Sequence, residues 1–364
     1  MRSTSSGGRV TLSGMSGSTD LQGLIIEELD APTAAVEDLR ARYDLQTLIR
    51  DELFPDDPRQ PFEEFVEDSR KVHEWSKPLR LAVWDAERSH LVANGFLSRD
   101  YVESNRHLAW VSAEVHPEHR QQGIATELLR RLVTAAKDDG RTVLGAQTTN
   151  ASAGTQFLPA RGFEAKQVGR MSRLHTKAVD RDLMERWAQD AATNASDYAL
   201  LRMDDRVPDD VVETWLALEN VMNTAPRDDL EMEDFVPNVE RFRTQESEML
   251  EQGYRGWRVI AVHQPTGQWA GYSELFFSPH HPEVVEQWGT AVDPVHRGHG
   301  IGRWVKAANI LRLLDEKPEA ERVETWNAKS NGPMLDINVA MGFEVVRWST
   351  TFQAPIDKVE ATLQ

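Results

Sequence analysis

The second half of the chain shows strand-like and helix-like patterns of apolar residues. Two strand-like segments, 257–263 and 269–277, flank Pro265-Thr266-Gly267, which is a typical turn sequence. Apolar residues recur at helical spacing over 301–314, which predicts a helix there. The other elements predicted in this half are strands at 198–202, 286–292, 322–326 and 345–352 and a helix at 333–341. Strand pairs mixed with helices favour an α/β fold with a mixed, largely antiparallel central sheet flanked by helices.

The elements of the second half recur in the first half at a nearly constant offset. Segments 116–133 and 293–310 share the pattern P-x-H-R-x-x-G-I-small. The tripeptide Gly-Phe-Glu stands before a late strand in both halves, at 162–164 and at 342–344. Short opening strands are predicted in both halves, at 24–28 and 198–202. Three matches in the same order indicate one ancestral domain that has been duplicated.

We therefore expect two similar domains fused as a pseudo-dimer. The expected order is a disordered Ser/Gly-rich tail at 1–20, an N-terminal domain at 21–178, a polar linker helix within 179–195 and a C-terminal domain at 196–364.

Composition narrows the class of protein. Apolar residues make up 40% of the chain and charged residues 27%, as in globular proteins, and no apolar run is long enough to span a membrane. The absence of cysteine excludes disulfides and thiolate metal sites, and we expect no metal and a cytoplasmic location. A net charge of −18 argues against nucleic acid as a partner and favours cationic ones. The sequence leaves open whether the protein is a monomer or a homodimer.

The repeated segment has the features of an anion-binding loop. In each half it follows a strand that ends in Val-x-Pro and precedes a helix. The unpaired N–H groups and the positive dipole end of a helix N-terminus favour a phosphate there. Glycine allows the backbone to approach such a group closely. The glycines in question are Gly123, Gly298, Gly300 and Gly302.

The pattern V-x-P-x-x-R-x-x-G-I-A/G resembles the coenzyme A loop of the GNAT acetyltransferase superfamily, over about 22–178 and 197–358. This resemblance implies acetyl-CoA as the co-substrate and transfer of its acetyl group to an amine. It places the cofactor-binding residues at Val115, Arg120, Gln121, Gln122, Gly123, Ile124, Ala125, Val292, Arg297, Gly298, His299, Gly300, Ile301, Gly302 and Asn331.

Two other phosphate-binding motifs do not fit. A dinucleotide fold needs G-x-G-x-x-G, but the third position is Arg303 when counted from Gly298 and Val305 when counted from Gly300. A P-loop needs Gly-Lys-Ser/Thr, which the sequence lacks.

The resemblance also implies catalytic positions. Where the family uses a strand glutamate as general base, it lies six positions before the valine of Val-x-Pro, which is Glu286 here. Glu274, within a strand of otherwise buried character, is the alternative base. The tyrosine that protonates the leaving thiolate in the family is replaced by Asn338, which keeps only hydrogen-bonding capacity.

The first half lacks all of these polar groups, because the corresponding residues are Ala109, Ala151 and Leu158. We therefore expect the C-terminal half to catalyse and the N-terminal half to be structural or to bind the cofactor without turnover. The alternative is a non-catalytic acyl-CoA-binding or sensing protein with two degenerate sites.

Two acidic segments, 50–68 and 227–235, follow the first strand of each half. In this fold that region caps the acceptor site, so the segments would suit a small cationic amine such as an aminoglycoside-like compound, a polyamine or a peptide amine. Equally, they fit solvated helix faces. Whether acylation occurs on nitrogen or on oxygen, and the length of the acyl chain, are left open.

Overall fold

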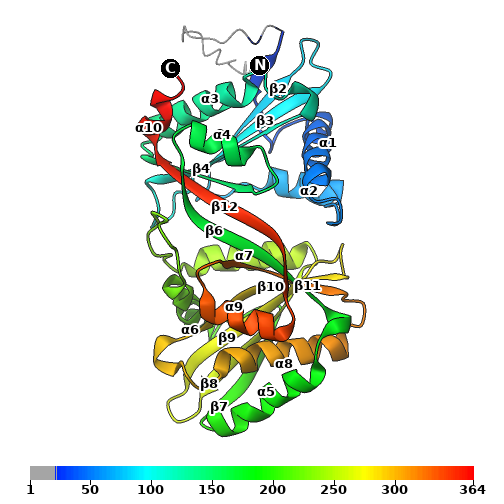
Figure 1. The fold of residues 1–364 in the computed structure, drawn as a ribbon, viewed down its shortest axis with the longest axis vertical. Coiled ribbons are helices and arrows are strands. Elements are labelled where there is room, and N and C mark those ends of the chain that lie inside the picture. Colours follow the sequence, from blue (N-terminus) through cyan, green and yellow to red (C-terminus); the bar gives the residue numbers. More distant parts are fainter. Residues whose placement is uncertain (1–20, 22) are drawn as a thin grey trace, which may run out of the picture.

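A computed structural model describes residues 21 and 23–364 of the chain, so the tail expected at 1–20 lies outside the described residues. The described strands form one twelve-stranded sheet in the order β1-β2-β3-β4-β5-β12-β6-β11-β10-β9-β8-β7, which runs the length of the molecule (Figure 1). Two of its ladders, β4–β5 and β10–β11, are parallel and the others are antiparallel. The expected mixed, largely antiparallel sheet is confirmed.

The two halves contribute equivalent elements. The first half contains the strands β1 (Ile25–Glu28), β2 (Leu79–Trp84), β3 (Leu91–Ser98), β4 (Leu108–Val115), β5 (Val143–Thr149) and β6 (Glu164–His175) and the helices α1 (Val36–Leu53), α2 (Phe62–Arg70), α3 (Ile124–Asp138), α4 (Gly154–Ala160) and α5 (Arg181–Asn194). The second half contains the strands β7 (Tyr198–Asp204), β8 (Arg255–His263), β9 (Gln268–Phe277), β10 (Val284–Val292), β11 (Arg322–Ala328) and β12 (Glu344–Pro355) and the helices α6 (Val212–Glu219), α7 (Val239–Glu251), α8 (Ile301–Glu316), α9 (Gly332–Met341) and α10 (Ile356–Ala361). Every element expected in the second half is present, with ends within a few residues of those predicted.

The last strand of each half is exchanged with the other half. β6, from the first half, pairs with β11, and β12, from the second half, pairs with β5. β6 and β12 also pair with each other. This pairing makes the sheet continuous between the upper lobe of Figure 1, which contains β1–β5, and the lower lobe, which contains β7–β11. Each lobe is therefore completed by a strand from the other half of the sequence.

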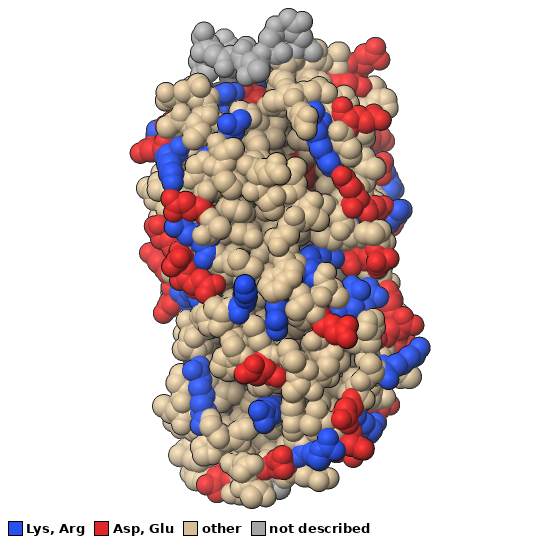
Figure 2. Space-filling model, in the orientation of Figure 1, with Lys and Arg blue, Asp and Glu red and all other residues tan. Residues whose placement is uncertain are grey.

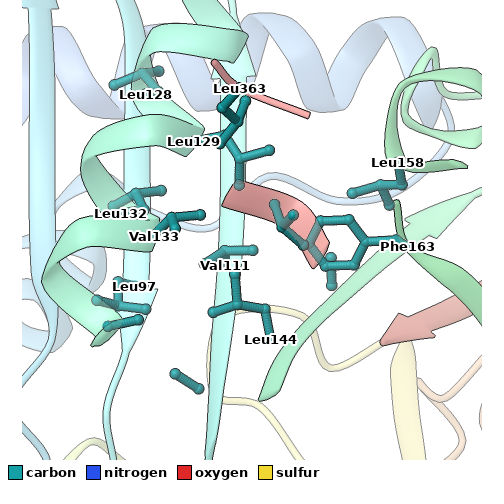
Figure 3. Packing of buried hydrophobic residues seen from close by; sticks show 14 of the residues in the cluster. Leu97, Val111, Leu128, Leu129, Leu132, Val133, Leu144, Leu158, Phe163 and Leu363 are labelled. Carbon is teal, nitrogen blue, oxygen red and sulfur yellow. The ribbon is translucent and has the colours of Figure 1, made fainter. Parts of the chain in front are cut away.

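The hydrophobic cores show the same exchange. In the upper lobe, Leu128 and Leu132 of α3, labelled in Figure 3, belong to one cluster with Phe352 of β12 and with Val359 of α10. In the lower lobe, Leu174 of β6 packs with residues of α8. Burial of large apolar side chains at these positions stabilises each lobe only when the exchanged strand is in place.

The expected linker helix, α5, is a packed part of the lower lobe. It lies against α8, and its Met184 and Trp187 are buried in the core there. Its polar residues face outward, which explains its polar appearance in the sequence.

None of the helices among the described residues is long and apolar enough to cross a membrane. On the face shown in Figure 2, acidic and basic side chains are interspersed over both lobes.

Candidate functional site

The two repeated loops adopt the same backbone conformation. α3 and α8 each begin directly after a glycine in the left-handed region, Gly123 with φ 85° and Gly300 with φ 76°. Two residues earlier, Gln121 and Gly298 also have positive φ, 62° and 88°. A side-chain atom added at Gly298 or Gly300 would meet nothing within 4 Å, so this loop faces open space. Ile124, Ala125, Ile301 and Gly302 form the first turns of the two helices.

The loop arginines hold each loop to the strand before it. Nε of Arg120 donates to the carbonyl of Val115 at 3.2 Å, and Nε of Arg297 donates to the carbonyl of Val292 at 3.0 Å. The structure thus gives the matching arginines and valines of the two motifs the same local role.

The terminal nitrogens of the two guanidinium groups have different hydrogen-bond partners. Arg120 binds both carboxylate oxygens of Glu52, and this hydrogen bonding lowers the pKa of Glu52. Arg297 donates to the hydroxyl of Thr224 at 2.9 Å and forms no ion pair with any described residue. A carboxylate beside the first loop disfavours an anion there, whereas the second loop keeps its positive charge.

The two loop histidines make structural contacts. Nδ1 of the buried His296 lies 2.9 Å from the hydroxyl of Tyr198, and Nδ1 of His299 lies 3.2 Å from the carbonyl oxygen of Asn194. Among the described residues, no group of three or more His, Asp or Glu side chains is placed to hold a metal ion.

β10 separates from β11 beside the second loop. The parallel pairing covers only Val284 to Glu286, after which the two strands diverge. On its other side, the ladder between β10 and β9 has a bulge between Gln287 and Thr290. Residues 288 and 289 consequently have no partner in that ladder.

The first half has the divergence without the bulge. β4 pairs with β5 only over Leu108 to Trp110, but its ladder with β3 is regular. The ring of Trp110 covers Gly145 so closely that a Cβ there would lie 2.6 Å from it. This aromatic ring therefore covers β5 at the point where the two strands begin to separate.

In the second half the divergence opens a cavity of about 350 Å³, which we call the splay cleft. It is lined by 286–290 of β10 and 324–327 of β11, together with Asn331 at the start of α9 and Lys306 of α8. Asn331, predicted to bind the cofactor, thus lines this cleft. Asn338 is fully buried behind the cleft, where it donates to the side-chain oxygen of Asn327 at 2.8 Å.

A second cavity, of about 310 Å³, lies between the sheet and helices α6 and α7, and we call it the α6–α7 pocket. Tyr272 and Glu274 of β9 line it, and Tyr272 packs against Trp215 of α6. The pocket and the splay cleft share Trp288 and Gly289 in the bulge. The two cavities therefore meet at the bulge, from the two sides of β10.

Glu274 is the buried acid at this meeting point. Its side chain is 5% exposed, and Oε1 accepts from Nε of Arg258 at 3.1 Å. Burial raises the pKa of Glu274 to about 7, although Arg258 opposes the shift. A Cβ on Gly289 would lie 2.9 Å from its Oε2, so this carboxylate touches the bulge. In the same pocket, burial raises the pKa of Glu219.

Glu286, the other predicted base, lies at the splay cleft. Its side chain is exposed, and Oε2 accepts from the indole N–H of Trp288 at 2.7 Å. Trp288 in turn lies over Phe276, with ring centroids 4.0 Å apart. The structure therefore brings both predicted glutamates to the bulge, one buried and one solvated.

The architecture is similar to that of known proteins. Residues 42–163 match the acetyltransferase (GNAT) family, a match that covers most of the first half. A tandem GNAT protein from the clavulanic acid biosynthesis pathway superposes with a TM-score of 0.70 at 23% identity, covering 92% of this chain and 98% of that one. A GCN5-related N-acetyltransferase from Sphaerobacter thermophilus gives 0.64 at 13% identity, covering 92% and 96%. The chain is a tandem GNAT-fold protein. Comparison with curated proteins gave no match.

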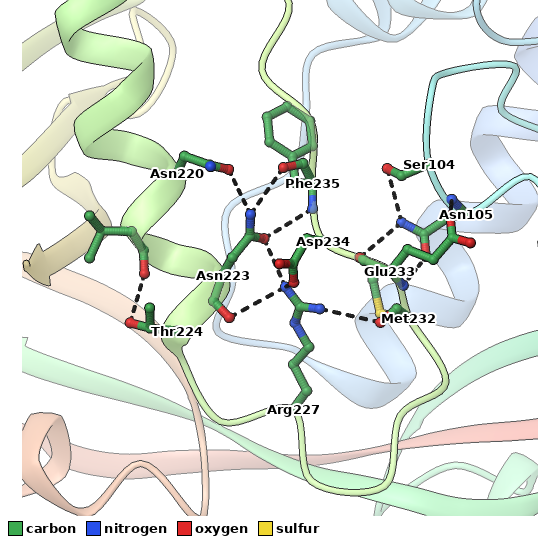
Figure 4. Close-up of polar contacts among 11 residues, drawn as sticks. Ser104, Asn105, Asn220, Asn223, Thr224, Arg227, Met232, Glu233, Asp234 and Phe235 are labelled. Carbon is green, nitrogen blue, oxygen red and sulfur yellow. Dashed lines mark hydrogen bonds and ion pairs between the residues drawn. The ribbon is translucent and has the colours of Figure 1, made fainter. Parts of the chain in front are cut away.

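In this tandem GNAT-fold protein, the acidic segment 227–235 does not point its carboxylates into the α6–α7 pocket. Asp234 pairs with Arg227 at 2.8 Å, and Glu233 accepts from the backbone N–H of Asn105. Asn223 holds the segment to the end of α6 by bonding both backbone groups of Phe235, as Figure 4 shows. The segment contributes Phe235 to the pocket lining instead.

The acidic segment 50–68 of the tandem GNAT-fold protein joins the two lobes. Asp57 forms ion pairs with Arg173 of β6 and Arg347 of β12, the two exchanged strands. Glu64 is buried and accepts from the hydroxyl of Tyr254 at 2.7 Å. Neither carboxylate belongs to a cavity described above.

Sequence reasoning missed Lys306, Glu219 and Arg258. One signal for Lys306 was available, since a lysine interrupts the apolar face of the helix predicted at 301–314. Glu219 and Arg258 gave no such signal, because the place of Glu219 in the pocket and of Arg258 beside Glu274 depends on how α6 packs on β8 and β9.

Proposed function

We propose that the C-terminal half of the protein transfers an acetyl group from acetyl-CoA to a small cationic amine. The GNAT fold is that of acyl-CoA-dependent N-acetyltransferases in general. The observation that carries the proposal is the meeting of two cavities at the bulge of β10, with the buried Glu274 at their junction. Donor and acceptor can then approach one another from opposite sides of a strand.

The chain's residues suit a coenzyme A co-substrate in the second half. The open loop at 297–302 offers backbone N–H groups and the N-terminus of α8 to a pyrophosphate. Asn331 and the facing edges of β10 and β11 would hold the pantetheine arm in the splay cleft. The bulge leaves residues 288 and 289 without partners in the β9 ladder. The backbone of Gly289 hydrogen-bonds Glu274, and the backbone N–H of Trp288 would polarise the thioester carbonyl.

Glu274 is the base that the geometry favours over Glu286. It faces the α6–α7 pocket, where the acceptor would lie, and its raised pKa makes the carboxylate an effective proton acceptor near neutral pH. Glu286 lines the splay cleft, is exposed to solvent and has its carboxylate bound to Trp288.

The lining of the α6–α7 pocket supports a cationic acceptor. Two carboxylates, of Glu219 and Glu274, face it together with the aromatic rings of Phe235 and Trp288, and the arginine of the lining, Arg241, is paired with Glu103. Carboxylates attract an ammonium group by charge, and aromatic faces attract it through the ring quadrupole.

A matched pair of loop substitutions tests which half of the protein catalyses acetyl transfer. Gly300→Glu places a carboxylate and a side chain in the left-handed position of the second loop, and Gly123→Glu does the same in the first. We expect Gly300→Glu to abolish coenzyme A release with every amine of a panel, whereas Gly123→Glu keeps it. Thiol release and acetyl-CoA titration calorimetry on both variants give the readouts.

Two results would contradict the proposal. Loss of turnover in Gly123→Glu alone would move catalysis to the first half, which is the half that matches the family model. Tight acetyl-CoA binding by the wild type without thiol release for any amine would favour an acyl-CoA sensor.

A further inference from the structure

Lys306 is a fully buried lysine inside the splay cleft. It lies in the second turn of α8, is 1% exposed and lines the cavity between β10 and β11. Its ammonium lies 5.2 Å from the centroid of the Phe343 ring. Lysine is almost never buried completely without a partner, so this position demands an explanation.

No carboxylate of the described residues neutralises this ammonium. The acids that share the cleft with it are Glu286 of β10 and Glu324 of β11. Glu286 accepts from Trp288, and Glu324 pairs with Arg173 of β6 and Arg322 of β11. Neither acid lies within 4.0 Å of the Lys306 ammonium.

The charged groups on the other elements around Lys306 point elsewhere. On α8 itself, Arg312 pairs with Asp204, and on α9 Asp336 is exposed to solvent. On α5, Arg181 pairs with Asp315 at the surface. On β8 and β9, which also pack on α8, Arg258 and Glu274 pair with each other. The positive charge of Lys306 therefore faces the cleft alone.

The first half contains apolar residues at the corresponding positions. Counted from the left-handed glycine before each helix, Lys306 corresponds to Leu129, and Asn338 corresponds to Leu158 when counted back from Gly-Phe-Glu. Leu129 and Leu158 belong to the same core cluster (Figure 3). The second half thus has a cation and an amide around a cavity where the first half has a packed core.

We propose that Lys306 is the acid that protonates the thiolate leaving group of the acyl donor. This inference rests on the proposed function of the second half. It assigns to a helix lysine the proton transfer that Asn338 cannot perform, because an amide has no proton to give at neutral pH.

Every proton is accounted for in one turnover of this reaction. The acceptor ammonium gives one proton to Glu274, and the free amine attacks the thioester carbonyl. On collapse, the carbon–sulfur bond breaks and the thiolate takes a proton from the Lys306 ammonium. The second proton on the new amide nitrogen returns to Lys306 through water, so that one proton per turnover is released through Glu274.

Burial supports this role, since it lowers the pKa of Lys306 to about 7. An ordinary thiol has a pKa of about 8.5, so proton transfer from this ammonium to a thiolate is downhill. The same burial makes Lys306 lose its proton above neutral pH, which gives the proposal a measurable signature.

The test compares Lys306→Met with Lys329→Met, which removes an exposed lysine after β11. We expect Lys306→Met to lower kcat by about 100-fold or more, as is usual when a general acid is lost, with the KM for acetyl-CoA little changed. The wild-type kcat should fall as pH rises above about 7, and this alkaline decline should be absent in Lys306→Met. Lys329→Met should match the wild type in both respects.

Lys306→Arg adds a second check, because a guanidinium keeps the charge but does not release its proton. If this variant restores wild-type turnover, Lys306 acts only through its charge and the proposal is wrong. It is also wrong if Lys306→Met keeps its kcat, keeps the alkaline decline, or changes only the KM. Failure of the proposed function itself would be seen separately, as a Gly300→Glu variant with full turnover.

Discussion

At the scale of single residues, burial reverses the order in which the sequence ranked two glutamates. Glu274 and Glu286 lie on neighbouring strands; spacing from the motif selected Glu286, and Glu274 was the alternative because its strand has buried character. Spacing does not reveal that Arg258 and α6 bury Glu274, nor that Trp288 binds Glu286 at the surface. Desolvation follows from tertiary packing, which a local pattern does not contain.

A pair of isosteric substitutions tests this ranking. Glu274→Gln should lower kcat by about 100-fold or more, because the base is lost, whereas Glu286→Gln should leave kcat within a few-fold of the wild type. A base must be deprotonated, and the pKa of Glu274 is about 7, so the wild-type kcat/KM should fall as pH decreases through that value. Steady-state kinetics measured from about pH 5.5 to about pH 8, a range in which most proteins are stable, provide the check. A steep loss in Glu286→Gln with normal turnover in Glu274→Gln would reverse the assignment.

At the scale of elements, the loops were predictable and the bulge was not. A left-handed backbone between a strand and a helix needs glycine, so Gly123 and Gly300 are visible in the sequence. The bulge in β10 depends on how the strand pairs with β9, and Gly289 alone gave no warning of it. The parallel pairs that end early, β4–β5 and β10–β11, likewise result from pairing over long sequence distances.

Substitution of Gly289 tests whether catalysis requires the geometry of the bulge. In Gly289→Ala, the new Cβ would lie 2.7 Å from the hydroxyl of Tyr272 and 2.9 Å from Oε2 of Glu274, so the base and the bulge must shift. We expect a large loss of kcat, while acetyl-CoA binding, measured by calorimetry, changes little. Gly332→Ala is the control, since a Cβ there meets nothing within 4 Å. Equal kinetics for the two variants would show that the bulge geometry is not required.

At the scale of the whole molecule, the duplication was evident from the repeated motifs, but the exchange of β6 and β12 was not. The sequences of β6 and β12 do not indicate which lobe each strand completes, because that depends on pairing between residues far apart in the chain. The exchange is instead fixed by contacts between distant residues, such as Asp57 with Arg173 and Arg347. The division into 21–178 and 196–364 therefore describes two sequence repeats whose final strands lie in each other's lobe.

This exchange predicts how separated halves behave. A fragment of residues 1–195 would lack β12 and α10, so its core would lose Phe352, Ile356 and Val359, and β5 would have an open edge. Losing one buried phenylalanine alone costs about 3–5 kcal/mol, which is a large part of a typical domain's stability. We expect 1–195 and 196–364 to be poorly folded when expressed singly and to form a folded 1:1 complex when expressed together. Size-exclusion chromatography and thermal unfolding followed by circular dichroism distinguish the cases. Two monomeric fragments that each unfold cooperatively would show that neither lobe depends on the strand it receives from the other half.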